Sequence, residues 1–303
     1  MKTSKITLSL SAMAIAAAVT VYSCKKKETK SGSAITAAPD TDTNSASDNN
    51  LAERTADDII NISGQIAENP TSSNFRSVCA SVTRATVHKT ITVTFNGTAC
   101  DDGRVRSGSL VFDFSSSAGK FYRIPGFSVT VTSNNYVVDG NAVTIINKTI
   151  TNNTASSFNP ASTNLTWTIA ANISIAKANN GGTVTWTTNK TKTLLNTSDT
   201  NVYHGPLRAI TWSKAIIGIT GNASGTTASG DKFTSNVTNQ LVRDFNCAPI
   251  SAYPGYHPFI NGTMDFTPGT KATRHIDNGY PNNRGCADSA SVAINGQVRL
   301  KAK

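Results

Sequence analysis

The chain has 303 residues, with 28 Lys and Arg against 18 Asp and Glu and a formal net charge of +10. Only three of its acids are Glu, namely Glu28, Glu53 and Glu68, so carboxylate chemistry after residue 70 would have to use Asp alone. No Gly-x-Ser-x-Gly, His-Glu-x-x-His or phosphate-loop motif occurs, which leaves the enzyme classes marked by these motifs without support.

The N-terminal segment has the layout of a bacterial lipoprotein signal. Lys2 and Lys5 precede an apolar run over residues 6–21, and the small residue Ser23 stands directly before Cys24. A transmembrane anchor is the alternative, but spanning a bilayer takes about 20 apolar residues. We therefore predict a signal peptide over 1–23 that is removed, with lipid attached to the thiol of Cys24.

Lipidation would anchor the mature chain to a bilayer, because two or more acyl chains give stable membrane attachment. Cys24 is followed by Lys25 and not by Asp. In the lipoproteins that this segment resembles, an Asp at that position favours retention in the inner membrane, so the resemblance points to the outer membrane. Whether the chain faces the periplasm or the cell surface stays open.

Residues 24–70 are rich in Ser, Thr, Ala, Asp and Asn. Such a segment has little to bury, so we predict a flexible tether. A short helix over 51–66 is the alternative, because Ile59 and Ile60 follow two aspartates there.

From about residue 71 the hydrophobic period becomes two, as in residues 86–95, which is typical of half-buried strands. The alternating run over 165–176 is followed by Asn179-Asn180-Gly181-Gly182, a strong hairpin signal. A turn centred on Asn180-Gly181 would pair Trp186 with Ile175 and Leu194 with Trp167. Asp139-Gly140 marks a second hairpin and residues 229–231 a third.

No helical period appears after residue 71, and turn signals recur steadily. We therefore predict an all-β domain over 71–303. Its long strands should form an antiparallel meander and a curled sheet, closing into a sandwich or partial barrel.

Four cysteines follow Cys24, and an even number in an exported protein predicts disulfides. Of the three connectivities we favour Cys79–Cys100 and Cys247–Cys286, because each of these pairs brackets neighbouring strands. A zinc site is the alternative, but no Cys-x-x-Cys pair occurs, and we expect no metal and no cofactor.

Residues 90–97, Thr-Ile-Thr-Val-Thr-Phe-Asn-Gly, lead to Cys100, and Asp102-Gly103-Arg104, Arg106-Ser107-Gly108 and the segment 277–286 follow later. At these positions the chain resembles a family of exported β-rich lipoproteins of the Bacteroidota that has no assigned activity. The resemblance covers most of the region from residue 79 to 300 and implies a shared fold. It transfers no catalytic residue.

Candidate catalytic residues are few. His275 and Asp277 stand two apart in a predicted strand, so they would share a face and form an imidazole–carboxylate pair. This motivates the alternative of a hydrolase built around His275. Asp101 and Asp102 fit a turn better than a calcium site. His88 fits a solvent-facing position on a strand better than a ligand role.

Charge gives a second functional indication. Seven of the 28 Lys and Arg precede residue 71, which leaves 21 against ten Asp in the β region. Arg104, Arg106, Arg123 and Lys120 would form a basic patch if their segments pair. Such a patch attracts anionic polymers, including lipopolysaccharide. Nucleic acid is not expected, because no aromatic–basic motif supports it.

These observations predict a membrane-anchored envelope lipoprotein that acts as a non-enzymatic binding or structural module. Glycan or another anionic polymer is the first ligand class to consider. Trp167, Trp186 and Trp212 are candidates for a sugar platform, although the predicted hairpin buries the first two. Asp288-Ser289-Ala290 matches a pattern of O-glycosylation in the Bacteroidota, so Ser289 is a candidate modification site.

Overall fold

The computed structural model describes residues 44–68, 78–85, 89–117, 120–249, 257–279, 286 and 289–302. The chain divides into two units, residues 1–39 and 40–303, and every described residue belongs to the second. The predicted signal peptide and the lipid acceptor Cys24 lie outside the described residues. They stay predictions.

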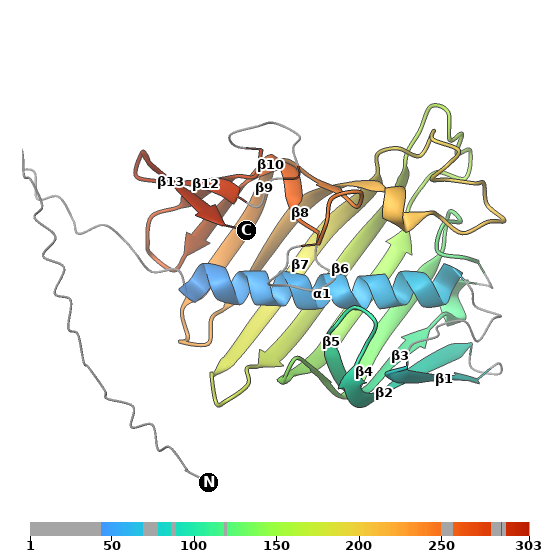
Figure 1. Ribbon diagram of the computed structural model, residues 1–303, viewed down its shortest axis with the longest axis horizontal. Helices are drawn as coiled ribbons and strands as arrows, with labels where there is room; N and C mark the ends of the chain where they lie inside the picture. Colours follow the sequence, from blue (N-terminus) through green and yellow to red (C-terminus); the bar gives the residue numbers. More distant parts are fainter. Residues whose placement is uncertain are drawn as a thin grey trace, which may run out of the picture. The chain divides into compact units, whose positions relative to one another are not determined.

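Most of the described residues form one antiparallel sheet in which strands adjacent in the sequence are adjacent in space (Figure 1). The strands are β1 (Ala80–Ala85), β2 (Thr90–Ala99), β3 (Val105–Asp113), β4 (Ser128–Val138), β5 (Asn141–Asn152), β6 (Leu165–Ala176), β7 (Thr183–Leu194), β8 (Ile216–Thr226), β9 (Lys232–Asp244), β10 (Phe259–Pro268), β11 (Arg274–Asp277), β12 (Ser289–Ile294) and β13 (Gln297–Ala302), with 3-10 turns at Ser115–Ser117 and Trp212–Lys214. The predicted all-β antiparallel meander is confirmed. Among the described strands the sheet is single and open, with β1 at one end and β13 at the other.

The sheet is curled, and β-bulges contribute to its curvature. Gly108 of β3 has a φ of +77° and Gly262 of β10 a φ of +99°. The pairing register shifts beside each of these glycines. A Cβ atom at Gly108 would lie 2.0 Å from the backbone oxygen of Asn135, and one at Gly262 would lie 2.2 Å from that of Gln240. Only glycine fits these positions, and bulges of this kind bend a sheet.

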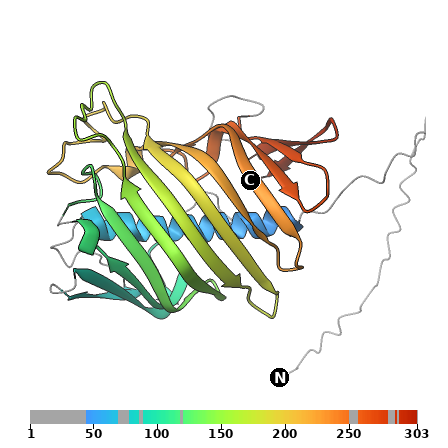
Figure 2. The same ribbon diagram turned by 180° about the vertical axis from the view of Figure 1, so that it is seen from behind.

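One long helix, α1 (Asn44–Glu68), crosses the strands on the concave side of the sheet (Figures 1 and 2). The helix expected over 51–66 therefore exists and is longer at both ends. The prediction of a flexible tether over 24–70 is wrong for residues 44–68, which belong to the β unit. The domain boundary predicted at residue 71 moves accordingly.

Apolar packing explains why this polar segment is helical. Seven side chains of α1 belong to the main hydrophobic core, namely Ala52, Ala56, Ile59, Ile60, Ile62, Ile66 and Ala67. Two of its buried hydroxyls are satisfied inside the helix: Thr55 donates to the carbonyl of Leu51 at 2.8 Å and Ser63 to that of Ile59 at 2.6 Å. The helix thus depends on the sheet for its burial, as most helices in proteins depend on tertiary packing.

The β6–β7 hairpin differs from its predicted register by two residues. Trp186 pairs with Ile173 and Leu194 with Leu165. The turn is centred on Asn179 and Asn180, whose φ values are 55° and 57°, and not on Asn180-Gly181. Positive φ values at both central residues define a type I′ turn. The two asparagines therefore adopt the backbone conformation that was expected of Asn180 and Gly181. A shift of two residues keeps each side chain on its predicted face.

Two disulfides join the favoured cysteine pairs. Cys79 is bonded to Cys100, with the Cα atoms 4.9 Å apart, and Cys247 to Cys286, with the Cα atoms 5.3 Å apart. The first links the segment before β1 to the end of β2. The second links the loop after β9 to the region before β12.

Candidate functional site

The concave face of the sheet places basic side chains among apolar ones. On β7, Lys190 and Lys192 have the same parity as Trp186 and Leu194, so the two-residue period of a strand turns all four toward α1. Lys148 of β5 also faces inward and is 0% exposed. Lys148 and Lys192 are buried and Lys190 is half-buried, so the charges of these amines need partners inside the fold.

The acids of α1 supply those partners. Every acidic residue of the helix forms an ion pair with a cation of the sheet or its loops. The pairs are Asp48–Lys177, Glu53–Lys190, Asp57–Arg243, Asp58–Arg104, Asp58–Arg106 and Glu68–Arg123. The concave face and α1 are therefore electrostatically complementary.

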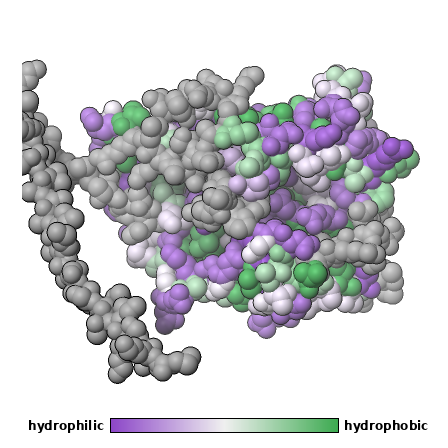
Figure 3. All heavy atoms as spheres, in the orientation of Figure 1, coloured by the Kyte–Doolittle hydropathy of each residue, from purple (hydrophilic) through white to green (hydrophobic). Residues whose placement is uncertain are grey.

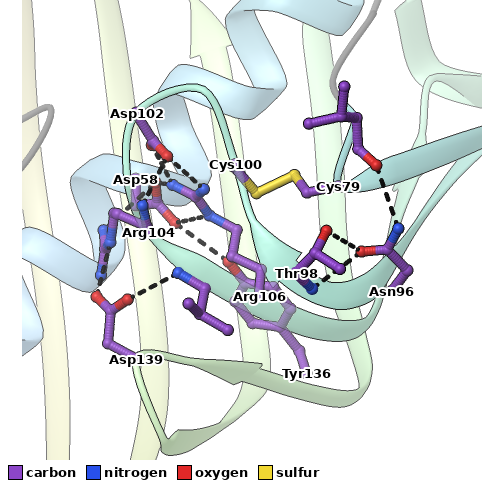
Figure 4. The surroundings of a disulfide bond; sticks show 12 residues. Asp58, Cys79, Asn96, Thr98, Cys100, Asp102, Arg104, Arg106, Tyr136 and Asp139 are labelled. Carbon is purple, nitrogen blue, oxygen red and sulfur yellow. Dashed lines mark hydrogen bonds and ion pairs between the residues drawn. A yellow bond between two sulfur atoms is a disulfide. The ribbon is translucent and has the colours of Figure 1, made fainter.

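The ion pairs of Asp58 belong to a larger cluster of charged and polar side chains (Figure 4). Its carboxylate accepts hydrogen bonds from Arg106 and, at 3.1 Å, from the hydroxyl of Tyr136, while Arg104 lies 3.3 Å away. Arg106 also donates to Asp102 at 2.9 Å. Burial raises the pKa of Asp102, but the hydrogen bonds and charge of Arg106 outweigh it and hold this pKa below its usual value. The carboxylate of Asp102 is thus ionised at neutral pH.

A second cluster lies where α1 crosses β7 and β9. The carboxylate of Glu53 accepts hydrogen bonds from Lys190, and that of Asp57 accepts one from Arg243 at 2.8 Å. Lys148 donates to the backbone oxygen of Ala56 at 3.2 Å. These residues belong to α1, β5, β7 and β9, so their contacts connect the middle of the helix to the middle of the sheet.

Lys192 is the exception in this cluster. It is 8% exposed, and its ammonium lies 4.6 Å from the ring centroid of Trp212. No described residue forms an ion pair or hydrogen bond with its Nζ. Burial lowers the pKa of Lys192 to about 8, and that of Lys148 to about 8 as well.

A cavity of about 30 Å³ lies beside Lys192, between α1 and strands β6–β10. Its charged lining consists of Glu53, Asp57, Lys190, Lys192 and Arg243. The wall therefore holds three cations against two carboxylates. Sequence reasoning did not find this site, although the parity of Lys190 and Lys192 with Trp186 was a usable signal.

The expected surface patch of Arg104, Arg106, Arg123 and Lys120 does not form. Arg106 is 4% exposed and Arg123 is 2% exposed. Both are ion-paired with α1, to Asp58 and Glu68, and Lys120 alone of the four is exposed. Three of these cations are internal counter-ions, which the sequence could not indicate without the position of α1.

His275 and Asp277 do not form the predicted pair. The Nδ1 atom of His275 lies 2.7 Å from a carboxylate oxygen of Asp265 on β10, directly across the strand pair. The carboxylate of Asp277 accepts a hydrogen bond from the backbone N–H of Gly279 at 2.8 Å. His275 is exposed, so this histidine lies on the surface and not in a cleft.

The remaining candidates have simpler roles or are not described. Asp102 accepts a hydrogen bond from the backbone of Arg104 in a turn, and no group of three metal-binding side chains occurs within the described ranges. Ser289 begins β12, and its modification stays a prediction. His88 lies outside the described residues.

The candidate sugar platform is part of the core. Trp167 and Trp186 are fully buried, as the predicted hairpin face implied. The indole N–H of Trp167 donates to the backbone oxygen of Tyr122 at 2.8 Å, and the Tyr122 ring stacks on it with centroids 4.9 Å apart. Trp212 packs against both rings, so all three tryptophans are packing residues.

The convex face, seen in Figure 2, has a different chemistry. Strands β4–β8 are described in full, and their only charged residues, Lys148, Lys190 and Lys192, all face α1. Uncharged polar side chains form rows across these strands. One row is Ser128, Thr151, Thr168, Thr191 and Thr220, and another is Asn147, Asn172, Thr187 and Ser224. The members are exposed or half-buried.

The surface on the α1 side is mixed in hydropathy. Figure 3 shows hydrophilic and hydrophobic residues intermixed over the described surface on the α1 side. Within the described part of the chain, no helix is long and apolar enough to cross a bilayer. No protein-family model, curated protein or solved structure matches this chain.

Proposed function

We propose that the protein is a non-enzymatic envelope module, anchored by lipid on Cys24, and that its convex face binds a glycan of neutral sugars. The observation that carries this proposal is the pair of uncharged polar rows across β4–β8. All charged side chains of these strands are directed to the other face.

The rows suit sugar hydroxyls, because threonine, serine and asparagine side chains both donate and accept hydrogen bonds. One such bond contributes only about 0.5–1.5 kcal/mol net. A polymer that spans several strands, each about 4.8 Å from the next, engages many of them at once. The face therefore favours an extended chain over a single small sugar.

A neutral glycan is favoured over an anionic polymer. The cations that suggested lipopolysaccharide, Arg104, Arg106 and Arg123, are paired with acids of α1. Long-range attraction of a polyanion needs uncompensated positive charge at the surface, and the convex face of β4–β8 has none.

The hydrolase alternative gains no support from the position of His275. Its partner is Asp265, which is half-buried, and His275 itself is exposed. A general base needs a nucleophile or a bound metal beside it. Among the described residues no metal-binding group is available to supply the latter.

The test is retention of the purified mature protein on insoluble neutral glycans and on immobilised lipopolysaccharide at low salt. The key variant is Thr187→Val with Thr191→Val and Thr220→Val. It removes three hydroxyls from the rows, and valine retains the shape and the strand preference of threonine. We expect the variant to lose most of its retention on neutral glycans.

Two controls make the result specific. Serine at the same three positions keeps the hydroxyls and should restore retention. Thr83→Val alters an exposed threonine on the edge strand β1 and should change nothing. Wild-type protein that is retained only on lipopolysaccharide, or a valine variant that binds glycan as wild type does, would overturn the glycan proposal.

Anchoring needs its own test. Cys24→Ser removes the thiol that would carry the lipid, so the protein should lack the mass of the acyl chains and keep its signal segment. A variant that has the same mass as the wild type, apart from the substitution itself, would remove the lipid anchor from the proposal and leave the glycan part standing.

A further inference from the structure

The cavity between α1 and the sheet has a composition that neither the fold nor the proposed glycan face requires. We propose that this cavity is a binding site for a small anion of the size of formate, nitrate or chloride, held by Lys192 with Arg243 and Lys190. The site lies on the concave side and is separate from the convex face.

The charge of the lining is the first argument. Lys190 is bonded to Glu53 and Arg243 to Asp57, so each carboxylate of the lining already has a cation. Lys192 is the third cation, and no described residue forms an ion pair or hydrogen bond with it. The charge of Asp57 acts on Lys192 as well, but that carboxylate is already bonded to Arg243. One negative charge in the cavity would balance the wall.

The burial of Lys192 is the second argument. Taking an ammonium out of water costs several kcal/mol unless an anion or hydrogen-bond acceptors compensate it. The ring of Trp212 offers a cation–π contact at 4.6 Å, which contributes about 0.5–2 kcal/mol and compensates only part of that cost. At neutral pH the amine is mostly protonated, because burial lowers its pKa only to about 8.

The size and shape of the cavity are the third argument. A cavity needs about 10–15 Å³ on this scale to hold one water molecule, and this one measures about 30 Å³. That is room for a few heavy atoms. Apolar and aromatic side chains, including Trp186, Phe245 and Phe259, complete the lining and strengthen any charge interaction by excluding water.

The architecture supplies a fixed geometry. Lys190 and Lys192 come from one strand, Arg243 comes from β9, and α1 closes the other side with Glu53 and Asp57. Arg243 is also held over the ring of Phe259, with its Cζ atom 4.3 Å from the centroid. These side chains are thus positioned before any ligand arrives, which lowers the entropy cost of binding.

The experiment is isothermal titration of the mature protein with sodium formate, sodium nitrate and sodium chloride at pH 7 and constant ionic strength. The first variant is Lys192→Met, which keeps the length of the side chain and removes its charge. The matched control is Lys148→Met, because Lys148 is also a buried lysine, bonds to the backbone of Ala56 and does not line the cavity.

A second variant guards against misfolding. Ala56→Val adds methyl groups to the cavity wall and leaves every charge in place. We expect saturable one-site binding of at least one of the three anions to the wild type and to Lys148→Met. Lys192→Met and Ala56→Val should each weaken it at least tenfold.

The proposal is overturned if none of the three anions binds the wild type saturably, or if Lys192→Met and Ala56→Val both bind as the wild type does. Should Lys192→Met fail to fold, the comparison of wild type with Ala56→Val still decides. Neither result depends on whether the convex face binds glycan.

Discussion

The concave and convex faces are built by the same strands and differ in what those strands direct to each side. On β7 the residues that face α1 include Lys190 and Lys192, whereas the residues that alternate with them, Asn189 and Thr191, face outward and are uncharged. The charges of β4–β8 therefore serve the packing of α1. The outward side of these strands carries no charge.

The largest effect on stability is expected from removing α1. A chain that begins at residue 70 would leave the inward lysines and arginines without their acids. It would also expose the part of the core filled by the isoleucines of α1, each of which contributes about 2–5 kcal/mol. The total exceeds the usual stability of a domain, so we expect no cooperative unfolding transition in urea.

A chain that begins at residue 40 is the control and should unfold cooperatively. Adding the 44–68 peptide to the shorter chain should restore part of the near-UV circular dichroism signal. If both chains unfold with the same midpoint, α1 is not an integral part of the fold.

The next largest effect should come from breaking one buried ion pair. Arg106→Met leaves Asp58 buried with one cation fewer, and removing one partner of a buried pair costs about 3–5 kcal/mol. We expect the midpoint of urea unfolding to fall accordingly. Replacing both partners, as Arg106→Met with Asp58→Leu, should recover part of the loss, and a double variant no better than the single would contradict this explanation.

The buried lysines should make the free energy of unfolding depend on pH. Burial lowers the pKa of Lys148 and Lys192 to about 8, from an ordinary value of 10.5. Between these values the unfolded chain binds more protons than the folded one, so the free energy of unfolding should rise with pH from about 8 to 10. The expected slope is on the order of 1 kcal/mol per pH unit for each lysine.

Urea unfolding at pH 8, 9 and 10 measures this slope. The variant with both Lys148→Met and Lys192→Met should show a clearly smaller slope than the wild type. Equal slopes would mean that these amines are protonated alike in the folded and unfolded chains.

The smallest stability effect is expected on the convex face. Thr187→Val, Thr191→Val and Thr220→Val should each change the free energy of unfolding by no more than about 0.5 kcal/mol, as exposed substitutions usually do. The same measurement that shows a large loss for Arg106→Met should therefore show almost none here. A large loss would indicate that the threonine rows are structural.

The strands could be predicted from the sequence because their signal is local. Alternation over 165–176 and 183–194 fixed which side chains face inward, and the burial of Trp167 and Trp186 agrees with it. The hairpin register was missed by two residues, because Asn179 and Asn180 adopt positive φ where Asn-Gly was expected. An error of two residues leaves each side chain on its correct face of the sheet, but it gives each residue the wrong partner on the neighbouring strand.

The helix and the cavity could not be predicted in the same way, because their signal is not local. Residues 44–68 are polar, and composition alone favours a tether for such a segment. The partners that make the segment foldable lie far along the chain, such as Lys190 for Glu53 and Arg243 for Asp57. Inward-facing cations in a region without Glu were the available indication that an acidic element packs against them.

Hydrogen exchange of the backbone amides tests most directly whether α1 is part of the folded unit. The native mature protein would be labelled at neutral pH and analysed segment by segment. We predict that amides over 52–66 are protected to a degree similar to those of β6 and β7. Exchange of these amides at the rate of an unstructured peptide, with β6 and β7 protected, would contradict the account of the concave face.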